Sequence, residues 1–168
     1  APDKIGKAYR IEDARGRYIE YAKQSLGTTP LKGLKMVVDC GHGAAYLLAP
    51  LIFKELGAQV IKYGVEPDGI NINDHCGALH PEAAGQMVRQ QQADLGVSFD
   101  GDADRVIFTD ATGATVSGDR ILALCALALK NRGELRHDTM ACTVMSNLGL
   151  HEAMHQAGIK VVTTPVGD

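Results

Sequence analysis

The sequence contains no tryptophan, and aromatic residues make up only 5% of its 168 residues. A surface of stacked aromatic side chains for single-stranded nucleic acid is therefore not expected. The formal net charge is −3 at pH 7, so no basic excess is present to attract nucleic acid or an anionic membrane. The longest unbroken apolar run, Ile121–Leu129, has nine residues, whereas a membrane-spanning helix needs about 20. We expect neither nucleic acid nor a membrane as a partner.

Cysteine is also scarce, and its four positions are too widely spaced for a zinc-binding pair. Each lies in or beside an apolar stretch, which predicts reduced thiols in a cytoplasmic protein. The chain does not begin with a charged leader followed by an apolar segment, so no secretory signal is expected. It begins with Ala1, and Asp168 directly follows an expected strand. We therefore expect a piece of a longer enzyme.

Short apolar runs alternate with helical patterns, and glycine and proline separate them. A strand over 34–39, a helix over 44–56 and a strand over 58–63 form one parallel βαβ unit. Pro81 stands where a further helix begins. The predicted fold is α/β, with a mixed, mostly parallel sheet and helices on both faces.

Three segments are expected along the chain. Residues 1–13 precede the first expected helix, and 14–135 contain the elements of an α/β domain that carries the metal-binding sequence described next. Residues 136–168 contain two expected strands and one helix, which is too little to close a core. We interpret them as an incomplete second βαβ unit, the start of a further α/β domain. Its apolar face is expected to pack poorly or to associate with another copy of the chain.

The most informative stretch is the acidic sequence that follows an apolar strand. Asp100, Asp102 and Asp104 occupy alternate positions, and residues two apart in an extended loop point the same way. Three converging carboxylates repel one another unless a cation lies between them, and oxygen ligands suit Mg²⁺ or Ca²⁺. The adjacent Arg105 suits a phosphate contact. An open Mg²⁺ site beside an arginine is typical of phosphoryl transfer, whereas a solvated acidic turn would need neither the small spacers nor the arginine.

Two other interpretations of this stretch can be compared with it. An EF-hand needs a glycine after the third aspartate and a glutamate at loop position twelve, where the sequence has Arg105 and Ala111. A phosphatase with Asp100 as a covalent nucleophile remains an alternative, although Asp104 stands where threonine or valine would be expected. For the chain as a whole, a stable metal-free α/β module without enzymatic activity is a further hypothesis.

Two further motifs are weaker. His151-Glu152-Ala153-Met154-His155 formally matches a zinc motif, but the position of a third histidine holds Val161. An exposed helix face in a βαβ unit explains the motif more simply. The polar loop over 66–73 is rich in proline, glycine and asparagine, which favours a network of turns over direct substrate contact.

The sequence DGDADR at 100–105 resembles the metal-binding loop of the α-D-phosphohexomutase superfamily. Three further stretches resemble its bacterial phosphoglucosamine mutase branch rather than its phosphomannomutase/phosphoglucomutase relatives, which remain an alternative. These stretches are EPDGININ at 66–73, TVMSNLGL at 143–150 and TPVGD at 164–168. The resemblance covers nearly the whole chain. It implies that residues 1–13 are a tail or linker from a preceding domain, 14–135 a second domain and 136–168 the start of a third.

This resemblance implies interconversion of glucosamine 6-phosphate and glucosamine 1-phosphate, through a phosphoserine and a bisphosphorylated sugar. It implies one Mg²⁺ per chain held by Asp100, Asp102 and Asp104, with Arg105 contacting the phosphoryl group. Hexosamine 1,6-bisphosphate would be the activator and intermediate of the full enzyme, in the amino-sugar metabolism that supplies cell-wall precursors. The family's nucleophilic serine has no counterpart here, so the chain alone is predicted to be inactive.

Overall fold

The computed structural model describes residues 6, 9, 11–27 and 30–167. The chain divides into two compact units, Ala1–Ala114 and Thr115–Asp168, which we call the first and the second unit. Most of the tail predicted over 1–13 lies outside the described residues, as does Asp168.

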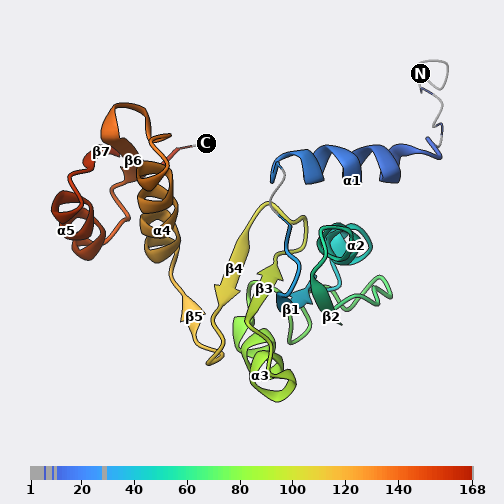
Figure 1. Ribbon diagram of the computed structural model, residues 1–168. Coiled ribbons are helices and arrows are strands. Elements are labelled where there is room, and N and C mark those ends of the chain that lie inside the picture. The colour runs from blue at the N-terminus through green and yellow to red at the C-terminus, as the bar shows by residue number, and fades with distance from the viewer. Residues whose placement is uncertain (1–5, 7–8, 10, 28–29, 168) are drawn as a thin grey trace. The chain divides into compact units, whose positions relative to one another are not determined.

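The first unit alternates strands and helices, as Figure 1 shows from blue to yellow. Its elements are α1 (Ala14–Gln24), β1 (Lys35–Asp39), the 3-10 helix η2 (Ala44–Tyr46), α2 (Leu48–Glu55), β2 (Gln59–Tyr63), α3 (Pro81–Gln91), β3 (Leu95–Phe99) and β4 (Val106–Thr109). Pro81 is the first residue of α3, as predicted, and Gln92 ends that helix in a left-handed conformation.

The strands form one mixed sheet in the order β2-β1-β3-β4-β5, where β5 (Thr115–Val116) is the first element after the boundary. β1 pairs in parallel with β2 and β3, and β4 runs antiparallel to β3. The predicted α/β class with a mixed sheet is therefore confirmed.

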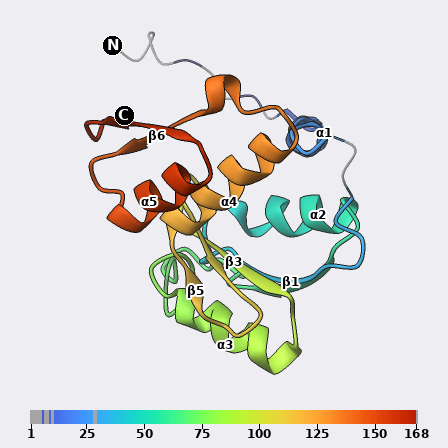
Figure 2. The same ribbon diagram turned by 60° about the vertical axis from the view of Figure 1, so that its left-hand side comes forward.

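Helices cover both faces of this sheet. Alternate residues of β1 point to opposite sides, and because they are apolar on both sides, each face needs a helix to bury it. Met36 and Val38 are buried on one side, in the core cluster that includes Ala49 of α2. Val37 is buried on the other side against Val88 of α3. Figure 2 shows α2 and α3 on opposite sides of the strands, so the predicted two-sided cover is confirmed.

The parallel arrangement brings three loops to one edge of the sheet. β1, β2 and β3 run in the same direction, so the segments that follow Asp39, Tyr63 and Phe99 all begin at their carboxyl ends. In open α/β sheets, ligands bind at this edge. The acidic sequence after Phe99 therefore lies where such a sheet ordinarily carries its function.

The second unit begins with β5, and its remaining elements are α4 (Gly118–Asn131), the 3-10 helix η3 (Arg136–Asp138), β6 (Thr139–Thr143), α5 (Leu148–Gln156) and β7 (Lys160–Thr164). Side chains cap both α-helices: Ser117 Oγ accepts from Arg120 N at 3.4 Å, and Asn147 Oδ1 accepts from Leu150 N at 3.0 Å. β6 and β7 are parallel and form a separate two-stranded sheet.

The boundary between the units differs from the one predicted at 135/136, because α4 belongs to the second unit. Ala126 of α4 is buried in one cluster with Met140, Leu150 and Met154. The second unit therefore has its own small core, to which α4 contributes Ala126. Within the described residues, no helix is long and apolar enough to cross a membrane.

Candidate metal centre

The acidic loop that joins β3 to β4 is a closed turn rather than the extended segment expected from the sequence. Asp100 N donates to Arg105 O at 3.2 Å, and Ala103 N donates to Asp100 O at 3.1 Å. Ala103 adopts a left-handed conformation with φ 63°. The carboxylates therefore converge because the turn folds back on itself, not because alternate residues share a face.

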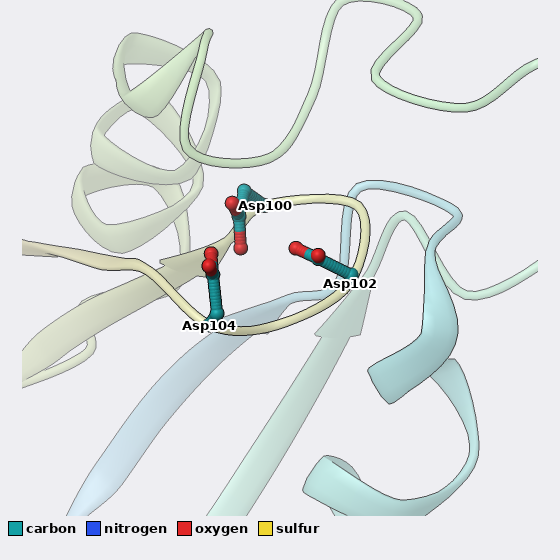
Figure 3. Close-up of side chains that lie close together, drawn as sticks. All are labelled: Asp100, Asp102 and Asp104. Atoms are coloured by element: carbon teal, nitrogen blue, oxygen red, sulfur yellow. The ribbon is translucent and has the colours of Figure 1, made fainter. Parts of the chain in front are cut away.

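The structure brings the three predicted aspartates together. One carboxylate oxygen each from Asp100, Asp102 and Asp104 lies within 4.8 Å of the other two. Figure 3 shows the three side chains pointing toward one another from the loop. Asp100 is buried, with 5% of its surface exposed, whereas Asp102 and Asp104 are exposed. The cluster therefore has one fixed side and one open side.

Arg105 fixes the buried carboxylate. Its backbone N–H donates to Asp100 Oδ1 at 3.0 Å, and its Nε donates to Asp100 Oδ2 at 2.8 Å. The same Nε lies 3.4 Å from Asp104 Oδ1, while 76% of the Arg105 side chain stays exposed. The guanidinium is thus held at the cluster but still faces solvent, where a phosphate could reach it.

The pKa values of Asp100 and Asp104 are shifted in opposite directions. The Arg105 backbone N–H, with help from the guanidinium, holds the pKa of Asp100 below its usual value. The pKa of Asp104 is raised, because its side chain shares a hydrogen bond with Asp100 and both Asp100 and Asp102 repel its charge. This is the conflict expected of converging carboxylates, and a divalent cation would relieve it.

Two other loops hold this turn in place. Ala44 N, at the start of η2, donates to Gly101 O at 2.8 Å, and Ala78 N donates to Phe99 O at 2.9 Å. The loop after β1 lies so close to the acidic turn that a Cβ at Gly43 would collide with the Gly101 carbonyl oxygen. The position of the aspartates therefore depends on all three loops at the carboxyl edge.

Sequence reasoning did not single out Asp39, the last residue of β1, whose side chain is fully buried. Burial raises the pKa of Asp39, and the backbone N–H groups of Gly41 and Gly77 oppose that change by hydrogen bonding to the carboxylate. An ionisable residue that ends an apolar strand is the signal that could have identified it. Its partners could not be identified in the same way, because they are backbone groups.

The polar loop over 66–73 is held by the network of turns that its composition favours. Asp68 Oδ1 accepts from Ile70 N and Asn71 N, both at 2.9 Å. Asn71 Oδ1 accepts from Asp68 N at 3.0 Å, and Asn71 Nδ2 donates to Glu66 O at 2.9 Å. These side chains shape the loop itself.

Within the described part of the chain, the two histidines of the sequence HEAMH belong to no group of three or more potential metal ligands. His151 is half-buried with Nε2 3.8 Å from Cys142 Sγ, whereas His155 is exposed on α5. Among the described residues, the three aspartates are the group of three or more potential ligands that lie close enough to share an ion. Glu152 and His155 are exposed on α5, as the interpretation of HEAMH as an exposed helix face predicts, whereas His151 is half-buried.

The fold and the acidic loop together define an α/β protein that has a carboxylate cluster at the carboxyl ends of its parallel strands. The family model for phosphoglucomutase/phosphomannomutase, alpha/beta/alpha domain II, matches residues 16–113. The model for domain III of that family matches residues 117–168. The chain belongs to the phosphoglucomutase/phosphomannomutase family. The gap between the two matches contains the boundary between the two units.

Curated relatives make the likeness more specific. The chain is 54% identical over 166 residues to the phosphoglucosamine mutase of Citrifermentans bemidjiense, a match that covers 98% of this chain and 37% of the relative. It is 53% identical over 165 residues to the phosphoglucosamine mutase of Desulforamulus reducens, with the same two coverages. The chain thus spans little more than a third of the length of these relatives.

Solved structures share the fold. A phosphoglucomutase/phosphomannomutase family protein from Burkholderia thailandensis superposes with a TM-score of 0.80 at 27% identity, over 95% of this chain and 35% of that one. A protein from Thermus thermophilus described as a putative phosphomannomutase gives a TM-score of 0.72 at 20% identity, over 97% and 38%. The second likeness shows the fold alone.

Proposed function

We propose that this chain forms the metal-binding part of a phosphohexomutase that interconverts glucosamine 6-phosphate and glucosamine 1-phosphate. The convergence of three carboxylates beside Arg105 carries this proposal. The glucosamine preference rests on the 54% identity to a phosphoglucosamine mutase. A phosphoserine and a hexosamine 1,6-bisphosphate intermediate, as the family resemblance implies, belong to the same proposal.

The donor set suits Mg²⁺. Asp100, Asp102 and Asp104 supply carboxylate oxygens only, and hard oxygen ligands are what Mg²⁺ prefers. Two of the three side chains are exposed, so water or a substrate phosphate could complete the coordination. When bound, the cation would neutralise charge that develops on a phosphoryl group during transfer.

The chain's own residues would orient that group. The contacts of Arg105 with Asp100 and Asp104 hold the guanidinium at the edge of the cluster, where it can bind phosphoryl oxygens. The buried Asp100 would remain ionised to lower pH than Asp104, because Arg105 lowers the pKa of Asp100. A fixed carboxylate beside an open, cationic side chain is an arrangement that positions a phosphate by electrostatics.

The alternative with Asp100 as a phosphorylated nucleophile is disfavoured by its contacts. Oδ1 and Oδ2 of Asp100 both accept hydrogen bonds from Arg105, and the residue is buried. A nucleophile needs an accessible oxygen aimed at phosphorus. Exposure of the chain to BeF₃⁻ should therefore give no adduct on Asp100, and an adduct detected by NMR would favour the phosphatase.

A Mg²⁺ titration of the isotope-labelled chain tests the metal site. We expect amide shifts confined to residues 99–105, and their loss in Asp102→Asn. Glu152→Gln, which alters an exposed carboxylate of HEAMH in the second unit, is the matched control and should leave the titration unchanged. Shifts spread over the whole chain, or centred on α5, would contradict the proposal.

The chain alone is expected to lack mutase turnover, because the family resemblance places the nucleophilic serine in another domain. A coupled assay that follows glucosamine 1-phosphate formed from glucosamine 6-phosphate checks this expectation. Turnover by the isolated polypeptide would show that the chain has a nucleophile of its own.

A cytoplasmic location is part of the same proposal. Cys40, Cys76, Cys125 and Cys142 are all free thiols, as is usual in a reducing compartment. Sugar phosphates of amino-sugar metabolism are the expected partners. Nucleic acid and membranes are not expected to be partners.

A further inference from the structure

Asp39 lies at the carboxyl end of the central strand and takes no part in the carboxylate cluster. Its side chain has no exposed surface, and a buried carboxylate is costly unless its hydrogen bonds are satisfied. Oδ1 accepts from Gly41 N at 3.0 Å, and Oδ2 accepts from Gly77 N at 2.6 Å. One carboxylate therefore joins the loop after β1 to the loop after β2.

Both glycines are held in backbone conformations that suit this role. Gly41 and Gly77 have φ values of 56° and 75°, in the left-handed region where a side chain is strained. A Cβ at either position would lie 3.3 Å or less from the carbonyl oxygen of Phe99. The two loops thus lie directly against the residue that precedes Asp100.

The same two loops hold the acidic turn on both sides of Asp100. Ala78, next to Gly77, donates its N–H to the carbonyl of Phe99, and Ala44 donates to the carbonyl of Gly101, both within 2.9 Å. Asn73 N donates to Gly41 O at 2.8 Å, which joins the loops a second time. Hydrogen bonds, joined by short stretches of backbone, therefore connect Asp39 to the peptide groups that flank Asp100.

We propose that Asp39 is a positioning residue: its carboxylate fixes the loops that place Asp100 against Asp102 and Asp104, and its loss weakens divalent cation binding without any contact with the ion. This inference rests on the proposed metal site. Asp39→Asn keeps the size of the side chain but replaces one acceptor oxygen by an amide donor, so one of the two glycine N–H groups loses its partner.

The test is a Mg²⁺ titration of the 168-residue chain followed by amide NMR. We expect Asp39→Asn to raise the dissociation constant about tenfold, the lower end of the effect of outer-shell partners. In the metal-free protein, the amide signals of Gly101 and Asp102 should move together with those of Gly41 and Gly77. Val88→Ala, which removes volume from the buried cluster on the other face of the sheet, is the matched control. It should lower stability and leave the affinity unchanged.

Ala44→Pro is a second variant that acts at the far end of these connections. Proline removes the N–H that donates to Gly101 O and places its ring Cδ against that oxygen, while its fixed φ suits the first residue of η2. Gly43 is already extended, as the residue before a proline should be. The variant should weaken Mg²⁺ binding while the Gly77 signal stays in place, and it serves as the test if Asp39→Asn does not fold.

The outcomes separate the inference from the proposed function. If the unmodified chain binds no Mg²⁺, the metal site fails, and the shift of Gly101 in metal-free Asp39→Asn still shows whether Asp39 positions the acidic turn. If the unmodified chain binds Mg²⁺ and Asp39→Asn binds it equally well, with Gly101 unmoved, the positioning role is overturned. An equal loss of affinity in Val88→Ala would also overturn it, because general destabilisation would then explain the result.

Discussion

The two units contain the same parallel strand–helix–strand motif, but they surround their strands differently. In the first unit, β1 has a parallel neighbour on each side, and four of its five residues are buried. In the second unit, β6 has the single partner β7, and four of the five residues of β7 are exposed. The first arrangement is typical of a buried parallel sheet, and the second leaves much of its sheet uncovered.

This difference explains why the acidic cluster forms in the first unit. A central strand with two parallel neighbours directs three loops to one edge, and there Ala44 and Ala78 bind the acidic turn from two sides. A two-stranded sheet has no such central position. The potential ligands His151 and His155 of the second unit accordingly lie on one helix, and no described residue joins them to form a group of three ligands.

The largest expected effect tests whether the two units are independent. Met154 is fully buried in the small core of the second unit, and Met154→Ala should cost about 2–5 kcal/mol of its stability. Hydrogen exchange should then accelerate in β6 and α5, while β1 and β3 keep their protection. Equal loss of protection in β1 would mean that the units unfold together and would remove the basis for comparing them.

A smaller effect is expected where two loops of the first unit meet. Gly43→Ala places a methyl group against the Gly101 carbonyl, and such overpacking costs about 1–3 kcal/mol. The variant should also weaken Mg²⁺ binding. Gly16→Ala in α1 is its matched control, because a Cβ there meets nothing within 4 Å and alanine favours a helix by about 0.5–1 kcal/mol. Thermal unfolding should show opposite signs for the two variants, and a Mg²⁺ titration should show a loss of affinity in Gly43→Ala alone. Equal effects in both variants would contradict the predicted collision.

The pH dependence of the acidic turn should be smaller again. Asp104 has a raised pKa and Asp100 a lowered one, so Asp104 takes up a proton first as the pH falls. Mg²⁺ affinity should begin to decline above the usual aspartate value of about 3.9, because protonated Asp104 no longer offers a charged ligand. Carboxyl ¹³C titration of the metal-free chain checks the order, and titration of Asp100 before Asp104 would contradict it.

The weakest expected effect is self-association through the second unit. Val144, Met145, Leu148 and Val166 are large apolar residues that are exposed there, with Leu148 at 83% and Met145 at 78%. Sedimentation velocity should detect a concentration-dependent dimer, and Met145→Lys with Leu148→Lys should abolish it. Ile70→Lys, at an exposed apolar residue of the first unit, is the control that should leave the dimer intact.

Local signals in the sequence are enough to predict most elements of the fold. The strand expected over 34–39 is observed as Lys35–Asp39, and Pro81 begins α3, because side-chain periodicity and proline act over a few residues. The boundary between the two units, which follows Ala114 and not residue 135, could not be found in this way. The apolar run in α4 is compatible with either unit, and only its packing against Met140 and Met154 assigns it to the second.

For the candidate site, too, the sequence predicts the local features but not the contacts between distant segments. Alternating aspartates beside an arginine are visible in the sequence, and the structure brings them within 4.8 Å of one another. Their supports are not visible, because Ala44, Ala78 and the partners of Asp39 act through backbone N–H groups that any residue except proline carries. The role of Asp39 depends on loops that are distant in sequence.

The pairing of β1 with β3 has a consequence for how the protein reaches its native state. Met36 pairs with Leu95, so a long intervening stretch must be ordered before the acidic turn meets the loops that support it. Contacts between such distant positions are slow to form. Capture of an ion by the turn should accordingly come late in refolding, and a luminescent lanthanide added during refolding would mark the moment at which the last part of the sheet assembles.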